Sequence, residues 1–404
     1  MKVLHISTYD TGGAAKAAIR LHQGLLKLGV KSSFLSLYSS NVKFEKKYQH
    51  LYTIKEKAFE YARIKWGLNN SRVEGQKIYR QRKHSSLEAA TLLKTNFDIT
   101  QQKVYKEADI INLHWTSSYL DYPSFWKKNL KPTVWTLHDM NPFSGIYHYR
   151  DDAVRNNKQL GGLDHAIEKA KGKLYQHTKI SVVCPSKWLL ECSRSSKLFR
   201  HFPHYHVPYS LDTTVFKLQQ QREAREKLGL PKDKKILLFV SQNVANYRKG
   251  YDLLLEAISQ IKGNSLVQAV AIGNPPKDKC EDVIYLGSIK EENEMAQAYA
   301  AADAFVMPSR EDNLPNVMLE SLACGTPVIS FPVGGALDIV TPGRNGWLTS
   351  EVSAESLAQT IQEWYRSPSP PNRYAISGEA EKRFALTTQA RSYKELYQNL
   401  VTQN

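Results

Sequence analysis

Short runs of β-branched and aromatic residues alternate with helical patterns along most of the chain, and this alternation constrains the fold more than any other feature. Parallel strands need a long crossover connection, usually a helix, so the order strand, helix, strand predicts an α/β protein with parallel sheets. In the first half the predicted strands cover residues 2–7, 33–37, 110–113, 133–137 and 179–183. In the second half they cover residues 235–240, 267–272, 283–286, 304–307 and 327–330.

The pattern divides near residue 212, where a long polar stretch precedes a fresh strand. A chain of 404 residues is long enough for two domains. We therefore predict two doubly wound, Rossmann-like domains that face each other across a cleft, with ligands at the carboxyl ends of the strands. The first domain covers residues 1–212 and the second residues 213–380. Apolar and aromatic residues at helical spacing predict a last helix within residues 381–404, which packs back on the first domain.

The net charge of +16 is confined to the first half of the chain. Residues 1–212 carry 34 Lys and Arg against 17 Asp and Glu, whereas residues 213–404 carry 21 against 22. This asymmetry predicts an anionic partner: nucleic acid, a membrane surface or a phosphorylated acceptor. Residues 42–83 hold twelve basic and four acidic residues with interspersed aromatic side chains. We interpret them as a peripheral contact with the anionic inner membrane or a lipid-pyrophosphate acceptor, with a solvated surface as the alternative.

The sequence also predicts the compartment. No apolar run approaches the ~20 residues that span a bilayer, and the first residues lack a secretion signal, so we expect a cytoplasmic protein. The four cysteines have neither the spacing of a disulfide framework nor that of a metal site, which predicts buried free thiols: Cys184, Cys192, Cys280 and Cys324.

In the first half, candidate site residues follow the predicted strands. The turn Gly12-Gly13 joins the first strand to a helix, where backbone amides can approach a phosphate or a sugar. Polar and aromatic pairs end two further strands: His114-Trp115 and His138-Asp139. A tight turn and a capping Asp beside a core His are the structural alternatives, but polar groups at several neighbouring strand ends favour a binding site.

In the second half, the segment SQNVANYRKG begins at Ser241 and follows the first predicted strand. Arg248 and Lys249 precede a helix and can clamp a diphosphate, with a solvated basic turn as the alternative. The longest ordered string is VMPSREDNLPNVMLESLACGTPVISFPVGG at residues 306–335. It places Asp312 in a polar loop and Glu320 in the next helix, so that the two carboxylates can bracket one ligand. The start of that helix offers further groups to a phosphate or sugar: Asn313, Leu314, Pro315, Asn316 and Val317.

This string resembles the hallmark of the retaining glycosyltransferases of family four, a pattern like PSxxEGFGxxxLEAxACGTPVV. Asp312, beside Glu311, stands at the first acidic position and Glu320 at the second. The resemblance extends over nearly the whole chain, through TGGAA, TLHDMNPFSG, CPSKWL, VPYSLDTTVF, RKGYDLLLEA and GRNGWL. It implies the GT-B fold of two Rossmann-like domains. With EDNLPN in place of EGFG, the string is similar to a branch that builds bacterial exopolysaccharide, capsule or lipopolysaccharide.

The resemblance also implies roles. Glu320 would hold the donor ribose, Asp312 and His138 would meet the donor sugar, and Arg248 and Lys249 would bind its diphosphate. The catalytic set is then His138, Arg248, Lys249 and Asp312. The donor-binding set is Gly12, Gly13, Ser241, Gly287, Ser288, Asn313, Leu314, Pro315, Asn316, Val317 and Glu320. The acceptor side comprises His114, Trp115 and Asp139.

The implied reaction is hexosyl transfer from a UDP- or GDP-linked sugar to a saccharide or lipid-linked acceptor, with retention of anomeric configuration. The leaving diphosphate would take the acceptor proton in a front-face displacement, so the cations supply most of the stabilisation. We expect no metal and no cofactor, since the sequence has neither a DxD-type motif nor a His/Cys metal cluster.

Other functions stay open at this point. A nucleotide-sugar epimerase or a glycogen-type phosphorylase would use the same fold, and an inactive sugar-nucleotide sensor would keep the same binding residues. A nucleic-acid-binding protein would suit the sequence pI of about 9.4. We expect no nucleic-acid partner, because no DNA- or RNA-binding motif is present.

Overall fold

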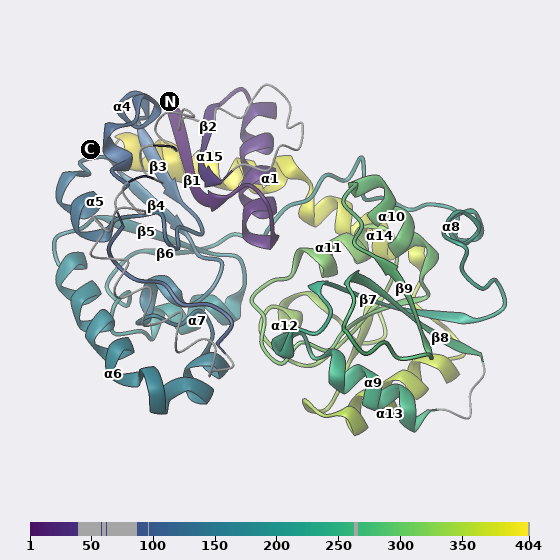
Figure 1. Ribbon diagram of the computed structural model, residues 1–404. Helices are drawn as coiled ribbons and strands as arrows, with labels where there is room; N and C mark the ends of the chain where they lie inside the picture. Colours follow the sequence, from purple (N-terminus) through teal and green to yellow (C-terminus); the bar gives the residue numbers. More distant parts are fainter. Residues whose placement is uncertain (39–57, 59–61, 63–86, 96, 262–265, 403–404) are drawn as a thin grey trace. The chain divides into compact units, whose positions relative to one another are not determined.

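The chain folds as two compact units, each built on a six-stranded sheet. The computed structural model describes residues 1–38, 58, 62, 87–95, 97–261 and 266–402 (Figure 1). The N-terminal unit comprises Met1–Pro208 and Gln389–Asn404, and the C-terminal unit comprises Tyr209–Thr388. Apart from residues 58 and 62, the basic segment 42–83 lies outside the described residues. Its contact with a membrane or an acceptor therefore stays a prediction.

The N-terminal sheet has the strand order β2-β1-β3-β4-β5-β6, and all neighbouring strands are parallel. Its strands are β1 (Lys2–Tyr9), β2 (Lys31–Tyr38), β3 (Ile110–Leu113), β4 (Thr133–Thr136), β5 (Ile180–Cys184) and β6 (His204–His206). Its helices include α1 (Gly13–Lys27), α4 (Lys103–Glu107), α5 (Tyr122–Lys128), α6 (Arg150–Tyr175) and α7 (Lys187–Arg194). The five strands expected in this half are present. β6 is not predicted by the sequence, because its three residues form no apolar run.

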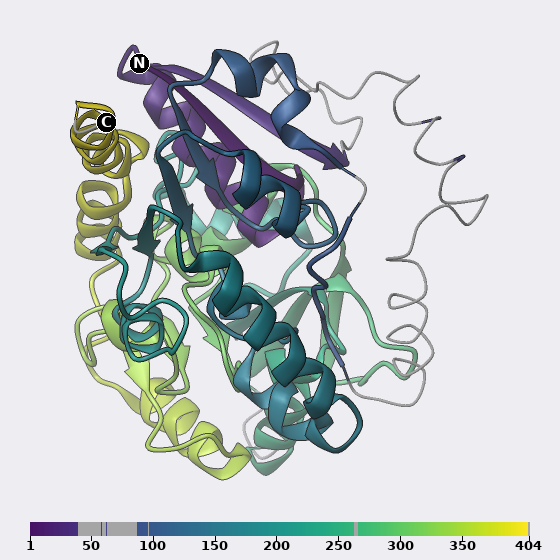
Figure 2. The same cartoon turned by 90° about the vertical axis from the view of Figure 1, so that its left-hand side faces the viewer.

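Different helices cover the two faces of this sheet (Figures 1 and 2). Successive side chains of each strand point to opposite faces and so contact different helices. Val3, Ile110 and Val134 pack with α1 and with α15 (Leu386–Thr402). On the opposite face, Leu4 and Trp135 belong to a larger cluster that includes residues of α4, α5, α6 and α7. The sheet is therefore covered on both faces, as an all-parallel sheet requires.

The last helix, α15, is fixed to the N-terminal sheet by buried hydrogen bonds as well as by apolar contacts. The Asn112 side-chain amide donates to the Tyr397 hydroxyl at 2.7 Å. The Thr136 hydroxyl lies 2.8 Å from the Tyr393 hydroxyl, and both tyrosines are fully buried. These pairs satisfy polar groups that would otherwise be buried without partners.

The C-terminal sheet has the strand order β12-β11-β10-β7-β8-β9, again with parallel neighbours. Its strands are β7 (Lys235–Asn243), β8 (Val267–Asn274), β9 (Val283–Gly287), β10 (Ala304–Met307), β11 (Val328–Ser330) and β12 (Gly346–Leu348). Its helices are α8 (Gln221–Leu228), α9 (Tyr251–Gln260), α10 (Glu292–Ala301), α11 (Asn316–Ala323), α12 (Ala336–Ile339), α13 (Ala354–Arg366) and α14 (Arg373–Phe384). The five expected strands are present, and the short β12 is an addition.

Each sheet has one point at which the chain reverses its direction of travel across the sheet. In the N-terminal sheet this switch point lies between β1 and β3, and in the C-terminal sheet it lies between β7 and β10. Connections on the two sides of a switch point leave in opposite directions, which opens a crevice at the carboxyl ends of the strands. The strand order alone thus marks where a ligand of each unit should bind. Within the part of the chain that is described, no helix is long and apolar enough to cross a membrane.

Replacing Tyr397 by Phe tests how strongly α15 is held. The substitution leaves the buried Asn112 amide without its acceptor, so we expect the free energy of unfolding to fall by about 1–3 kcal/mol. Tyr374→Phe, whose side chain is 74% exposed on α14, should change it by less than about 0.5 kcal/mol. Urea unfolding followed by circular dichroism measures both, and equal stabilities of the two variants would contradict the assignment.

Candidate functional site

A cluster of two cations and a carboxylate forms at the switch point of the C-terminal unit. A short 3-10 turn, Tyr247–Lys249, follows β7, and the polar loop that carries Asp312 follows β10. Lys249 Nζ lies 2.5 Å from Asp312 Oδ2, and Arg248 Nη1 lies 3.3 Å from the same oxygen. Arg248 also donates to the backbone oxygen of Glu311 at 3.0 Å. The structure thus brings together three of the four residues predicted to be catalytic.

These neighbours keep Asp312 ionised. Burial by itself raises the pKa of a carboxyl group, but the charges of Lys249 and Arg248 outweigh it and hold the pKa of Asp312 below its ordinary value. The backbone N–H of Asn313 adds a hydrogen bond to Asp312 Oδ1 at 3.1 Å. A buried charge is costly without a partner, so each member of the cluster is needed by the others.

Two glycines allow the backbone to close around this cluster. Gly250 has a φ of +69°, and a Cβ built on it would collide with the backbone oxygen of Pro308. Gly334 has a φ of +53°, and its Cβ would collide with the backbone oxygen of Asp312. The loops after β7, β10 and β11 therefore approach one another backbone to backbone, which fixes the position of Asp312.

Helix α11 carries the second acidic candidate. It begins at Asn316, and Pro315 stands before it as an N-cap residue with extended backbone. Because Pro315 lies before the first helical residue, its missing N–H costs no hydrogen bond within α11. Leu314 and Asn316 are buried and Val317 is half-buried. Glu320 is only 2% exposed, and its Oε2 accepts a hydrogen bond from the Tyr299 hydroxyl at 3.0 Å.

The other candidates of this unit lie at neighbouring strand ends. The Ser241 hydroxyl, near the end of β7, donates to the backbone oxygen of Asn243 at 2.8 Å. The Ser288 hydroxyl donates to Asn274 Oδ1, at the end of β8, at 2.7 Å. Gly287 ends β9 with a φ of +71°, in the region that favours glycine. These residues share the carboxyl edge with the cluster, and their roles in donor binding stay predictions.

In the N-terminal unit, the predicted Gly12-Gly13 turn ends β1 and begins α1. Gly12 is the N-cap residue with a φ of +89°, and the helix starts at Gly13. The first amides of α1 thus lie beside the carboxyl edge of the sheet. The contact of this turn with donor phosphates stays a prediction.

Three buried histidines form a hydrogen-bonded row across β1 and the ends of β3 and β4. His5 Nδ1 lies 2.9 Å from His114 Nε2, and His114 Nδ1 lies 3.0 Å from His138 Nε2. Burial lowers the pKa of His138 to about 4 and the pKa values of His5 and His114 well below their usual range. Each N–H···N bond needs one protonated and one bare nitrogen, so the row holds neutral rings with linked tautomers.

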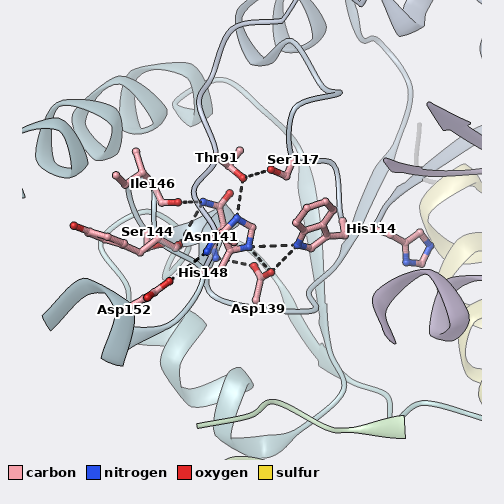
Figure 3. Close-up of polar contacts among 12 residues, drawn as sticks. Thr91, His114, Ser117, Asp139, Asn141, Ser144, Ile146, His148 and Asp152 are labelled. Carbon is pink, nitrogen blue, oxygen red and sulfur yellow. Dashed lines mark hydrogen bonds and ion pairs between the residues drawn. The ribbon is translucent and has the colours of Figure 1, made fainter. Parts of the chain in front are cut away.

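A second polar network is built on Asp139 (Figure 3). Asp139 Oδ2 lies 2.6 Å from His148 Nδ1 and accepts from the Trp115 indole N–H at 2.9 Å. His148 Nε2 lies 2.8 Å from the Thr91 hydroxyl, which donates to Ser117 Oγ at 2.6 Å. Burial on its own would raise the pKa of Asp139, but His148 lowers it below the ordinary value.

A pocket opens between the histidine row and the Asp139 network. Its lining includes all four polar and aromatic candidates of the first half: His114, Trp115, His138 and Asp139. The switch point of the N-terminal sheet therefore carries a polar, aromatic pocket. Its chemistry differs from that of the C-terminal unit, because neutral histidines replace the cation cluster.

A buried lysine holds the loop between Asp139 and His148. Lys171 Nζ donates to the backbone oxygens of Asn141 at 2.5 Å and Gly145 at 2.8 Å. Burial lowers the pKa of Lys171 to about 7, although nearby carboxylates, Asp139 first, oppose the shift. The carbonyl oxygens thus stabilise the ammonium group where water cannot.

Sequence reasoning missed several of these residues. Lys171 follows Ile167 and precedes Tyr175 by one helical turn each, so the apolar stripe of α6 could have placed it against the core. His148 belongs to none of the motifs that carry the resemblance. No sequence signal joins Thr91 or Ser117 to it, because they come from distant loops.

Neither metal sites nor disulfides are found in the described ranges. No group of three or more His, Cys, Asp or Glu there can hold a metal ion. Cys184 and Cys324 are buried, as expected, but Cys192 and Cys280 are half-buried. The expectation of four buried thiols is therefore wrong for two of them: Cys192 lies on the short, amphipathic α7, and Cys280 lies in the loop before β9.

Comparison with known proteins agrees with this geometry. Residues 220–383 match the family model described as "Glycosyl transferases group 1". The matched segment lies within the C-terminal unit, and it includes the cation cluster and α11. The chain is 29% identical over 189 residues to D-inositol 3-phosphate glycosyltransferase of Frankia alni, covering 42% of this chain and 46% of that protein. It is 27% identical over 239 residues to a putative teichuronic acid biosynthesis glycosyltransferase of Bacillus subtilis, covering 58% and 55%. The chain thus spans about half the length of these two relatives.

Solved structures identify the fold. Sucrose-phosphate synthase from Thermosynechococcus elongatus superposes with a TM-score of 0.70 and 18% identity over 100% of both chains. Anabaena HepE in complex with UDP-glucose superposes with a TM-score of 0.65 and 15% identity, over 99% of this chain and 100% of that one. At this level of identity the likeness concerns the fold alone. Together with the two parallel sheets, it confirms the expected GT-B fold of two Rossmann-like units.

Gly250→Ala tests the close approach around Asp312, with Gly229→Ala as its control. Both glycines have φ near +65–70°, but no atom lies within 4 Å of a Cβ built on Gly229. Gly229→Ala should cost about 1 kcal/mol of unfolding free energy from backbone strain alone. Gly250→Ala should cost at least about twice as much, because the loop at Pro308 must move. Urea unfolding measures both, and equal losses would show that the approach is not tight.

The histidine row predicts a fall in stability between pH 7 and pH 5. The unfolded state binds a proton on His138 near pH 6.5, whereas the folded state does so only near pH 4. The unfolded state therefore gains protons first as the pH falls, and His138 alone lowers the free energy of unfolding by about 2 kcal/mol at pH 5. Urea unfolding of His138→Asn should show a shallower pH dependence than the wild type. His165→Asn, on the exposed part of α6, should keep the wild-type slope. An unchanged slope in His138→Asn would refute the neutral row.

Proposed function

We propose that this protein is a retaining glycosyltransferase that moves a hexosyl group from a nucleotide-diphosphate sugar to an acceptor in bacterial surface polysaccharide synthesis. The observation that carries the proposal is the cluster of Arg248, Lys249 and Asp312 at the switch point of the unit that matches the group 1 glycosyltransferase model. Open α/β sheets bind their ligands at such points. A diphosphate is the ligand that two adjacent cations there would select.

In the proposed reaction, the acceptor hydroxyl attacks the anomeric carbon from the face that the diphosphate leaves. Negative charge develops on the leaving oxygen, and Arg248 and Lys249 are placed to stabilise it. The leaving phosphate takes the proton of the acceptor hydroxyl, so the step needs neither a separate general base nor a metal ion. Asp312 holds Lys249 in position and contacts the donor sugar, with His138 on the sugar side.

Glu320 has the geometry of a ribose-binding residue. Its carboxylate is buried and already oriented by the Tyr299 hydroxyl, and a carboxylate can accept hydrogen bonds from two vicinal hydroxyls. The backbone amides at the start of α11 lie on the same segment and suit a phosphate. A UDP- or GDP-linked donor fits these groups, and the UDP-glucose complex of Anabaena HepE supports a nucleotide sugar on this fold.

The comparisons also bear on the acceptor and the biological setting. The Bacillus subtilis relative, whose name assigns it to teichuronic acid synthesis, supports a role in surface polysaccharides. The acceptor is a saccharide or a lipid-pyrophosphate-linked saccharide, bound in the N-terminal unit beside His114, Trp115 and Asp139. A cytoplasmic location with peripheral contact with anionic lipid through residues 42–83 completes the proposal.

A thermal-shift screen with UDP, GDP, ADP and their common sugar conjugates tests the donor site. A ligand that binds only the folded state stabilises it, by about 2.7 kcal/mol when the ligand concentration is one hundred times the Kd. This stabilisation raises the melting temperature. One diphosphate should stabilise the protein selectively, and Glu320→Gln should remove this shift. Glu363→Gln, an exposed site on α13, should keep it. Absence of any shift, or equal shifts in the two variants, would refute the donor site.

Turnover separates the proposal from its alternatives. Asp312→Asn should lose sugar transfer while retaining part of the nucleotide shift, because the cations remain. Conversion of the donor into an epimer without an acceptor would instead identify an epimerase. A salt-sensitive complex with random oligonucleotides, without any nucleotide-sugar shift, would identify a nucleic-acid-binding protein.

A further inference from the structure

Three aromatic side chains form a row at the carboxyl ends of β2, β1 and β3. Tyr9 and Tyr38 are in-register partners at the ends of β1 and β2, and their rings stack with centroids 5.2 Å apart. The Trp115 ring lies 5.7 Å from Tyr9 on the other side. The row crosses the switch point of the N-terminal sheet, where a ligand is expected.

The outer part of this row is open to solvent. The Tyr38 side chain is 53% exposed and Tyr9 is 41% exposed, whereas Trp115 is half-buried. Adjacent exposed aromatic side chains are a feature of binding surfaces, since their burial against a ligand is favourable. Burial, with a smaller effect of Tyr9, raises the pKa of Tyr38, so its phenol stays neutral and can donate a hydrogen bond.

The inner end of the row joins the polar pocket. The Trp115 indole N–H donates to Asp139 Oδ2, and its ring lies 5.5 Å from the His148 ring. Trp115 and Asp139 also line the pocket beside the histidine row. One continuous surface therefore offers flat apolar faces at one end and hydrogen-bonding groups at the other.

A pyranose ring matches this combination. Its axial C–H bonds form an apolar face that can stack on an aromatic ring, while its equatorial hydroxyls point outward and need hydrogen-bond partners. We propose that Tyr38, Tyr9 and Trp115 form a stacking platform for a saccharide ring of the acceptor, with Asp139 binding hydroxyls at its inner end. This assignment rests on the proposed function and makes the sugar, rather than a lipid pyrophosphate, the part of the acceptor that this surface binds.

Charge supports the choice of a neutral sugar over a pyrophosphate. The carboxylate of Asp139 lies at the inner end of the row. A pyrophosphate placed there would meet a like charge, whereas sugar hydroxyls can donate hydrogen bonds to a carboxylate.

Saturation-transfer NMR on the full-length protein tests the platform. The probes are the methyl glycosides of glucose, galactose, mannose and N-acetylglucosamine. At least one should receive saturation at its ring C–H protons, and Tyr38→Ala should weaken its binding by about tenfold or more. Tyr38→Phe should retain binding, because the ring is kept. Tyr205→Ala should also retain it, since Tyr205 is a similarly exposed (39%) tyrosine on β6 of the same unit.

Three results would overturn the platform: no saturation with any glycoside, equal binding by Tyr38→Ala and Tyr205→Ala, or displacement of the glycoside by inorganic pyrophosphate. Thermal melting of each variant without ligand checks that it folds. The nucleotide shift that depends on Glu320 is measured on the same proteins. A retained nucleotide shift with no glycoside binding would refute the platform alone. Glycoside binding without any nucleotide shift would refute the proposed donor site alone.

Discussion

The attraction between Asp312 and its two cations is the interaction on which the arrangement of the C-terminal unit depends. Arg248 and Asp312 are buried, and buried charges persist only when they are paired. The pairing joins the end of β7 to the end of β10 across the switch point, so two loops far apart in sequence must meet. The close backbone approaches at Gly250 and Gly334 follow from this requirement, because any side chain there would separate the loops.

The two units use the same topological feature for different electrostatic purposes. At the C-terminal switch point, paired charges remain ionised in spite of burial. At the N-terminal switch point, burial has the largest effect and lowers the pKa of the histidines, so that the row stays neutral. A neutral, hydrogen-bonded surface suits hydroxyl groups, and a fixed cation cluster suits phosphate oxygens. The difference between the two switch points is therefore consistent with a sugar acceptor in the N-terminal unit and a nucleotide diphosphate in the C-terminal unit.

The sequence predicts the fold well because strand and helix periodicities are local properties. All ten expected strands are present, since each is an apolar run of several residues, whereas β6 and β12 have three residues each and depend on pairing with a neighbour. The sequence also predicts candidate residues next to strand ends, because the carboxyl ends of parallel strands lie at one edge of a sheet. Contacts between distant segments could not be predicted. The stacking of Tyr9 on Tyr38 depends on the register of β1 against β2, and the partner of His148 comes from a loop with no sequence signal.

The ion pairs of the cluster also affect how a donor would bind. Lys249 and Arg248 share one counter-ion, Asp312, so a diphosphate would meet one net positive charge instead of two. It would share the cations with Asp312, and each cation can do so because ammonium and guanidinium groups have several donors. The free-energy cost of bringing the two positive charges together thus arises when the protein folds and not when the donor binds. A site of this kind is preorganised. On this view Asp312 serves first to hold Lys249 and Arg248 in their binding geometry, and the proposed contact with the donor sugar would be a second function.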